Sequence, residues 1–135
     1  MKVVCDTNVL ISGILFGGNA RNVLDLISKG IITNFVSSAI LQETKEVLAR
    51  PKFGLKPEEV SMILELFKDT FEMVVPKTIV QCIDNDPDDD RILEAAGQAQ
   101  ADYIITGDNH LLALFRWNNI EIISPREFMD RFQAQ

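Results

Sequence analysis

The sequence predicts an α/β domain whose parallel sheet is covered by helices on both faces. Short apolar runs alternate along the chain with longer segments in which apolar residues have helical spacing. Strands that alternate with helices are joined by right-handed crossovers, which lay helices over both faces of the sheet. The chain has 135 residues and no internal repeat or linker, so we expect one domain over residues 1–135.

The first third of the chain shows this alternation clearly. KVVCD, residues 2–6, is a short apolar run that predicts a buried strand. NVLISGILF follows as a helix that GGN ends. Residues 20–29 form a second amphipathic helix, which Gly30 ends, and TNFVS at 33–37 is the second strand.

The middle of the chain holds two longer helices. Ser38 is the expected N-cap of a helix over residues 38–50, which ends before Pro51. Pro57 begins the next helix. EMVVP at 72–76 is either a third strand or the lead-in to an acidic segment. The apolar stripe of the second helix consists of Val60, Ile63, Leu64, Phe67 and Phe71.

The last third repeats the pattern. We expect a helix at residues 90–100, a strand at 101–106, a short helix at 110–116 and a strand at 120–124. A final helix over PREFMDRF begins at Pro125.

Two aspartates come just after expected central strands. Asp6 follows KVVC, and Asp108 follows YIITG. In α/β sheets ligands bind beyond the carboxyl ends of the strands, so these carboxylates are candidates for one site. Each could instead be only the N-cap of the helix that follows it.

Glu43 and Glu46 lie on the helix expected at 38–50, at different angles to its apolar stripe. At about 100° per residue, Glu43 lies at the border of the stripe and Glu46 lies nearly opposite. We therefore expect Glu46 to face solvent. Glu43 is either a surface residue or one that leans into a cleft beside the sheet.

The segment DNDPDDDR holds five aspartates within residues 84–90. On the helix that follows, Asp89 projects within roughly 50° of the apolar centre and Asp90 roughly 150° away. Asp89 is therefore the candidate for the sheet side. Asp88 and Asp90 favour the helix N-terminus through its dipole, and the first two aspartates belong to the loop before it. An EF-hand is excluded, because aspartate and alanine stand where its loop needs glycine and glutamate.

Carboxylates that converge on one pocket need a counter-ion. Two of them about 5 Å apart repel by roughly 3 kcal/mol at an effective dielectric constant of about 20. The chain has one histidine and two cysteines, so hard oxygen ligands dominate and favour Mg2+ or Mn2+. Such a pocket suits phosphoryl transfer, in which one or two metals activate water for in-line attack.

These residues stand in motifs that resemble those of the PIN-domain ribonucleases, in the branch described as toxin components of toxin-antitoxin modules. The motifs are CDTNVLISGILFGG, VSSAILQETKEVLARPKFG, DPDDDRILEAA and ADYIITGDNHLL, in this order. The resemblance implies a three-layer α/β/α sandwich with a central parallel sheet of four to five strands. It also implies a catalytic, metal-binding acidic quartet made of Asp6, Glu43, Asp89 and Asp108.

The same resemblance assigns supporting residues. Asn8 and Thr106 match polar positions that support the metal ligands. Asn8 could equally be only a helix-start residue, and Thr106 only a strand residue with a satisfied hydroxyl. Asp90, next to Asp89, is expected to support the same site. His110 is expected to be a surface residue at a helix start rather than a general base.

Basic residues gather in KEVLARPKFGLK, residues 45–56, although the net charge is -7 and the pI is about 4.6. An acidic protein is a poor electrostatic binder of nucleic acid, unless its negative charge is gathered in a cation-binding pocket. We expect Lys45, Arg50 and Lys52, with Arg21 as a weaker candidate, to contact an RNA backbone. The alternative is a solvated helix face that runs into a loop.

The start of the chain is expected to be folded structure rather than a signal peptide. Asp6 and Asn8 interrupt its apolar stretch, and no small-residue cleavage pattern follows. No apolar run reaches transmembrane length, so we expect no membrane contact. Cys5 and Cys82 form neither a CxxC motif nor a disulfide framework, which favours a reducing cytoplasm.

The expected function is that of a metal-dependent endoribonuclease, the toxin of a toxin-antitoxin pair. The resemblance implies an RNA substrate, a small antitoxin and, because dimers are frequent in the family, a second copy of the chain as partners. One alternative is a Mg2+-dependent phosphatase or phosphotransfer domain, but such a phosphatase needs DxDx where this chain has DTNV. The other alternative is a non-catalytic PIN-like binding module.

Overall fold

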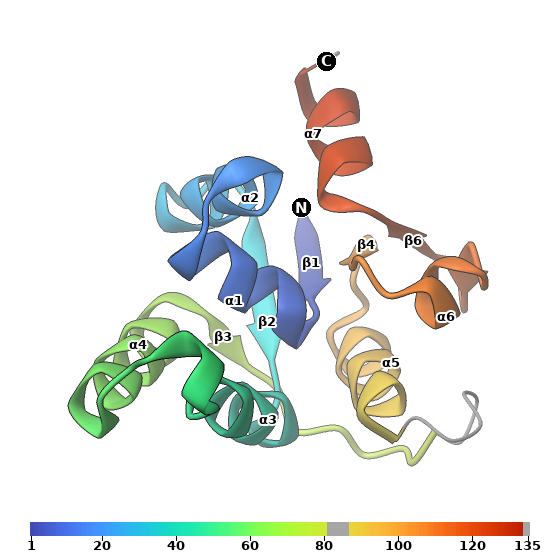
Figure 1. Cartoon of the computed structure of the whole chain (residues 1–135). Coiled ribbons are helices and arrows are strands. Elements are labelled where there is room, and N and C mark those ends of the chain that lie inside the picture. The colour runs from blue at the N-terminus through green and yellow to red at the C-terminus, as the bar shows by residue number, and fades with distance from the viewer. Residues whose placement is uncertain (81–86, 134–135) are drawn as a thin grey trace.

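The computed structural model describes residues 1–80 and 87–133, and within them six strands form one sheet (Figure 1). The strand order is β3-β2-β1-β4-β6-β5, and all neighbours are parallel except β5 and β6. Of the two possibilities for residues 72–76, the strand is present, but it is only two residues long and lies at one edge. The strands are β1 (Lys2–Cys5), β2 (Thr33–Val36), β3 (Glu72–Met73), β4 (Tyr103–Ile105), β5 (Arg116–Trp117) and β6 (Ile120–Ile123).

Helices cover both faces of this sheet. The connections from β1 through β2 to β3 run toward one edge, and those from β3 through β4 to β6 run toward the other. With right-handed crossovers, this reversal places α5 on the opposite face from α1 and α2. The expected three-layer α/β/α class is confirmed, with six strands instead of four to five. In the described residues the helices are α1 (Thr7–Leu15), α2 (Gly18–Ser28), α3 (Ser38–Leu48), α4 (Pro57–Thr70), α5 (Pro87–Ala99), α6 (Asn109–Leu112), α7 (Pro125–Gln133) and the 3-10 turn η1 (Pro51–Phe53).

The core lies between the central strands and the helices on either face. The side chains of residues 3–5 in β1 and of Ile104 and Ile105 in β4 are buried, as expected for parallel strands covered on both sides. On α4 the predicted apolar stripe is confirmed, with Ile63 half-buried at its border and the other four side chains buried. None of the helices described is long and apolar enough to cross a membrane.

The segment after β4 differs from the sequence-based expectation. The helix expected at 110–116 ends at Leu112, and Phe115 has a positive φ of 59° that no α-helix continues through. The chain then forms β5, which was not predicted. Asn118 and Asn119 join β5 to β6 with positive φ values of 50° and 66°, as a tight two-residue hairpin requires and Asn tolerates.

Two helix starts also differ from the expectation. Ser37, not Ser38, is the N-cap of α3, and its hydroxyl accepts a backbone N–H from the first turn at 3.3 Å. α5 begins at Pro87 rather than at residue 90, since proline suits the first position of a helix. The aspartates at 88–90 therefore all lie in the first turn of α5.

Candidate metal centre

The candidate site lies where the strand order reverses, between β1 and β4. β1 leads to β2 on one side and pairs with β4 on the other. Cys5 pairs with Ile105, and the Asp6 N–H donates to the Ile105 carbonyl oxygen at 3.1 Å, so the two strands end level with each other. The residues that follow the two strands are therefore brought together at the edge where α/β sheets bind ligands.

Asp6 is buried, with 5% of its surface exposed, and is held by both oxygens. Its Oδ1 accepts the Val9 N–H at 2.9 Å, which makes Asp6 the N-cap of α1. Its Oδ2 accepts a hydrogen bond from the hydroxyl of Thr106, which is itself fully buried. The Thr106 Oγ1 in turn accepts the Asp108 N–H at 2.9 Å. One threonine hydroxyl thus connects the two strand-end aspartates.

Burial raises the pKa of the Asp6 carboxyl above its ordinary value, and the nearby Asp108 carboxylate raises it further. The hydrogen bonds from Thr106 and from the Val9 N–H lower the pKa, because they favour the charged form. The effect of burial is the largest of these. Ionised Asp6 is therefore costly in this place, and a cation beside it would offset that cost.

Glu43 reaches the same region from α3. Its half-buried side chain accepts a hydrogen bond from the Thr7 hydroxyl, with 2.8 Å between Thr7 Oγ1 and Glu43 Oε2. Thr7 is the first residue of α1 and adjoins Asp6. Of the two orientations left open for Glu43, the structure has the inward one. The expected exposure of Glu46 is confirmed, and its carboxylate accepts a hydrogen bond from Gln42 at 3.2 Å.

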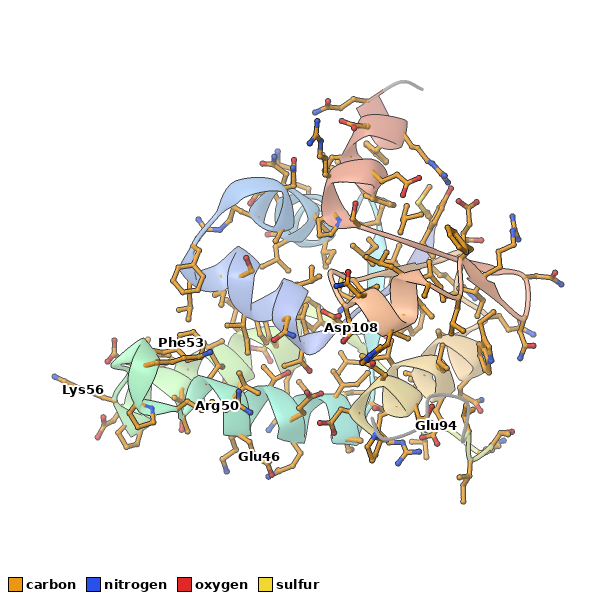
Figure 2. The ribbon with its side chains drawn as sticks, turned by 45° about the vertical axis from the view of Figure 1, so that its right-hand side comes forward. Glu46, Arg50, Phe53, Lys56, Glu94 and Asp108 are labelled. Carbon is orange, nitrogen blue, oxygen red and sulfur yellow. The ribbon has the colours of Figure 1, made fainter. Side chains whose placement is uncertain are left out.

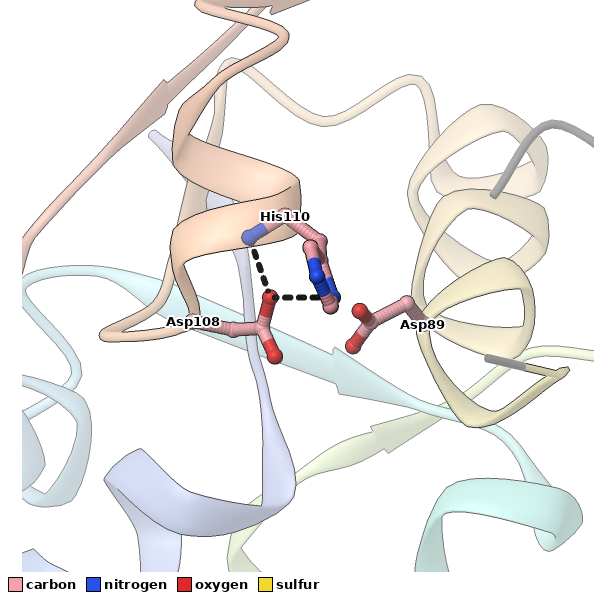
Figure 3. A group of neighbouring side chains, drawn as sticks. All are labelled: Asp89, Asp108 and His110. Carbon is pink, nitrogen blue, oxygen red and sulfur yellow. Dashed lines mark hydrogen bonds and ion pairs between the residues drawn. The ribbon is translucent and has the colours of Figure 1, made fainter. Parts of the chain in front are cut away.

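Asp89, Asp108 and His110 form a cluster in which one ligand atom from each residue lies within 4.8 Å of the others. Asp89 is buried in the first turn of α5, and its carboxylate faces that of Asp108 (Figure 3). Asp108 Oδ1 accepts the N–H groups of His110 at 2.7 Å and Leu111 at 3.2 Å, so Asp108 is the N-cap of α6, the role given above as an alternative to a place in the site. Because both of these N–H groups bind Oδ1, the capping role of Asp108 leaves its Oδ2 compatible with a further role.

The prediction that Asp90 points away from the apolar side of its helix is wrong. Asp90 is 5% exposed, although its position on the helix placed it away from the apolar side. That argument assumes one covered side, whereas α5 contacts α3 as well as β1, β2 and β4. Asp88 is exposed in the first turn, where its charge favours the helix. Asp84 and Asp86, like Cys82, lie outside the described residues.

The predicted RNA-binding residues lie along α3 and the turn after it. Lys45, Arg50 and Lys52 are exposed, and the Lys52 Nζ lies 5.1 Å from the centre of the Phe53 ring. Figure 2 shows Arg50, Phe53 and Lys56 together at one end of the molecule, away from Asp108. This stretch of residues 45–56 is called the basic segment below.

Arg21, on α2, and Asn8, on α1, lie near different ends of α1. The Arg21 guanidinium donates to the carbonyl oxygens of Gly13 and, at 3.1 Å, of Ile14, at the C-terminal end of the helix. That contact stabilises the last turn of α1, at the opposite end from Asp6. Asn8 is exposed in the first turn. The predicted roles of Arg21 in RNA binding and of Asn8 in supporting the metal ligands stay predictions.

Two residues of this region were not predicted to belong to it. Thr7 binds Glu43, and the only sequence signal was a hydroxyl next to a strand-end aspartate. His110 was expected on the surface, and it is exposed. Its proximity to Asp89 follows from the turn that Asp108 caps, and that geometry is visible only in the structure.

The donor set fits a hard divalent cation. Asp6, Glu43, Asp89 and Asp108 offer carboxylate oxygens, which suit Mg2+ and Mn2+. A raised pKa at Asp6 and the facing carboxylates of Asp89 and Asp108 both indicate negative charge that a cation would compensate. Within the described residues, Asp89, Asp108 and His110 have ligand atoms close enough together to hold one ion, and Asp6 and Glu43 are not part of that group.

The fold and this arrangement define an α/β domain with an acidic site at the carboxyl ends of its parallel strands. The family model of the PIN domain matches residues 2–110, so the chain belongs to the PIN domain family. No curated protein matches the chain.

Several solved structures share its fold. VapBC2 from Rickettsia felis, solved bound to a DNA fragment from their promoter, is 19% identical with a TM-score of 0.62, over 92% of this chain and 98% of that one. PAE2754 from Pyrobaculum aerophilum is 14% identical with a TM-score of 0.64, over 100% of both chains. FitAcB from Neisseria gonorrhoeae is 18% identical with a TM-score of 0.54, over 92% and 98%. At these identities the likeness shows the fold.

Proposed function

We propose that this protein is a Mg2+- or Mn2+-dependent endoribonuclease that hydrolyses RNA phosphodiester bonds. The observation that carries the proposal is the convergence of Asp6, Asp89 and Asp108 from three elements at the reversal point of the sheet. Membership of the PIN domain family supports it. A bound cation would supply charge neutralisation and the activation of water for attack on phosphorus.

The protein's own residues would bind and orient in this reaction. Asp6, Glu43, Asp89 and Asp108 would hold the cation, and Thr106 would keep the Asp6 carboxylate in a single orientation through its hydroxyl. The positively charged side chains of the basic segment would attract the phosphate backbone of the RNA. The Phe53 ring beside Lys52 would add a surface on which an unpaired base can stack.

Substitution of the strand-end aspartates tests the nuclease assignment. Asp6 and Asp108 both cap helices, so Asn is a better substitution than Ala because it keeps the capping oxygen. We expect Asp6→Asn and Asp108→Asn to lower the rate of metal-dependent cleavage of single-stranded RNA at least about 100-fold, since even partners that only orient a ligand are worth about 10–100-fold. Asp130→Asn, exposed on α7, is the matched control, and EDTA should abolish cleavage by the unaltered protein. Full activity in both site variants would refute the assignment.

We also propose that the protein acts as the toxin of a toxin-antitoxin pair. The motif resemblance supports this, as does the structural likeness to VapBC2 and FitAcB. A small antitoxin needs an apolar surface to bind, and side chains of α1, α2 and α4 line a pocket that includes Leu24, Leu66 and Phe71. The product of a short neighbouring reading frame should form a stable complex with this protein and inhibit its cleavage of RNA. A homodimer is part of the same proposal, and the mass of the free protein in solution tests it.

A further inference from the structure

His110 is an exposed residue whose ring lies beside the carboxylates of Asp89 and Asp108. It is the second residue of α6, and its backbone N–H binds Asp108 Oδ1 at 2.7 Å. Its Nδ1 lies 3.9 Å from the same oxygen, and its side chain is 72% exposed. The backbone contact therefore holds the residue beside the carboxylate (Figure 3), while the high exposure of the ring leaves it room to change rotamer.

The spacing of the three side chains is close to that of ligands around one ion. Oxygen ligands lie about 2.1 Å from Mg2+, so in its octahedral shell adjacent ligands are about 3.0 Å apart and opposite ligands about 4.2 Å apart. The ligand atoms of Asp89, Asp108 and His110 lie within 4.8 Å of one another. Side-chain shifts of roughly 1 Å would bring the three ligand atoms onto one ion. The ring of His110 is 72% exposed, so it can turn toward that position at little cost.

The chemistry of the imidazole then bears on which metal binds. Carboxylates suit Mg2+ and Mn2+ alike, whereas imidazole suits transition metals. Mg2+ prefers oxygen ligands and retains its water molecules, so it gains little from a nitrogen ligand. A site with two carboxylates and one imidazole therefore favours Mn2+ over Mg2+.

We propose that a ring nitrogen of His110 is a metal ligand, together with Asp89 and Asp108, and that it makes the site prefer Mn2+ over Mg2+. This inference rests on the proposed function, since it concerns the cation of the same site. It assigns to His110 a role different from the surface position expected from the sequence. This role differs from that of a general base. A neutral imidazole has one basic nitrogen, and when that nitrogen binds the metal it cannot accept a proton.

Because His110 is the only histidine of the chain, its nitrogens can be labelled without ambiguity. The experiment uses the full chain without an affinity tag, expressed with either natural or 15N-labelled histidine. The purified protein is then loaded with Mn2+. Pulsed EPR of the bound Mn2+ should show a histidine nitrogen coupling that changes on labelling. The coupling should be absent in His110→Gln and present in the control Asn109→Gln, whose exposed side chain adjoins it.

Affinities measured by calorimetry provide the second measurement. In His110→Gln the affinity for Mn2+ should fall about 10-fold while the affinity for Mg2+ changes less than about 2-fold, so that the preference for Mn2+ shrinks. If Mn2+ binds to the unaltered protein without a histidine coupling, and Asp108→Asn abolishes binding, His110 is no ligand although the metal site stands. If no divalent cation binds at all, both this inference and the proposed nuclease function are overturned.

Discussion

Thr106 shows how much of the candidate site depends on one buried hydroxyl. The hydroxyl donates to Asp6 and accepts the backbone N–H of Asp108, so it links the ends of β1 and β4. In the sequence Thr106 could equally have been a strand residue with a satisfied hydroxyl. The structure shows a satisfied hydroxyl, and the group that satisfies it is the carboxylate of Asp6, a predicted metal ligand. The support of metal ligands by Thr106 stays a prediction.

Removal of this hydroxyl should be costly for stability. Thr106→Val keeps the shape of the side chain but leaves a buried carboxylate oxygen and a backbone N–H without their partner. We expect the free energy of unfolding, measured with urea, to fall by about 1–3 kcal/mol. Thr106→Ser, which keeps the hydroxyl, should lose less. Equal stability of the Val variant and the unaltered protein would show that the hydroxyl contributes nothing.

The raised pKa of Asp6 predicts how the stability of the metal-free protein depends on pH. The folded-state pKa lies above the unfolded value of about 4, so the stabilisation that comes with the neutral form is complete below that value. It is lost as the pH rises through the folded-state pKa. Asn carries no charge at any pH and keeps the helix cap.

With EDTA present, Asp6→Asn should therefore unfold at a higher temperature than the unaltered protein at pH 7, and the difference should shrink toward pH 4. About 1 kcal/mol corresponds to roughly 3–5 °C in a domain of this size. Added Mn2+ should narrow the difference at pH 7 by stabilising only the unaltered protein. A gap that is constant from pH 4 to pH 7 would contradict the pKa argument.

The close packing of α1 on α2 depends on a glycine. A Cβ atom at Gly13 would lie 2.9 Å from the Ala20 carbonyl oxygen and 2.6 Å from Leu24 Cδ1. The first of these atoms belongs to the backbone of α2, so the two helices would have to separate. From the sequence alone, Gly inside a helix appears only as a cost of about 1 kcal/mol relative to Ala.

Gly13→Ala should therefore destabilise the protein although it improves the helix propensity of α1. We expect a net loss of about 1–3 kcal/mol in the free energy of unfolding, typical of overpacking. Ser61→Ala, at an exposed position of α4, is the control that has the gain in propensity without the clash. If both variants are more stable than the unaltered protein, the close approach of α1 and α2 is unimportant.

The elements themselves were mostly predicted, and the largest exception follows β4. The helix expected at 110–116 stops early because the chain turns at Phe115 to pair β5 with β6. The apolar spacing of this segment is compatible with a helix, but the pairing depends on a strand that comes later in the sequence. Asn118 and Asn119 are a local signal for this hairpin, but the apolar spacing of the segment favours a helix.

Across the whole molecule, a net charge of -7 works against the binding of RNA, so the placement of the positive charges matters. Lys45, Arg50, Lys52 and Lys56 fall within twelve residues that contain a single acidic residue, Glu46. The basic segment is therefore a local exception on an acidic surface.

Charge reversal within the basic segment should weaken the binding of single-stranded RNA. Arg50→Glu and Lys52→Glu should each lower the affinity, and each should reduce the slope of log K against log salt by about 0.7 for every phosphate that the protein no longer neutralises. Lys68→Glu, exposed on α4, is the control for the change in net charge. Fluorescence anisotropy over a range of salt concentrations measures both quantities. If Lys68→Glu has the same effect, the substitutions weaken binding through the net charge of the protein and not through the loss of RNA contacts in the basic segment.

The sequence by itself determined the α/β class, the order of most elements and the positions of Asp6 and Asp108. All three depend on local features, namely the alternation of apolar patterns and a carboxylate directly after an apolar run. The tertiary structure decided the inward turn of Glu43, the burial of Asp90 and the proximity of His110 to Asp89. A helix face is covered according to which elements pack around it, and those neighbours come from distant parts of the chain.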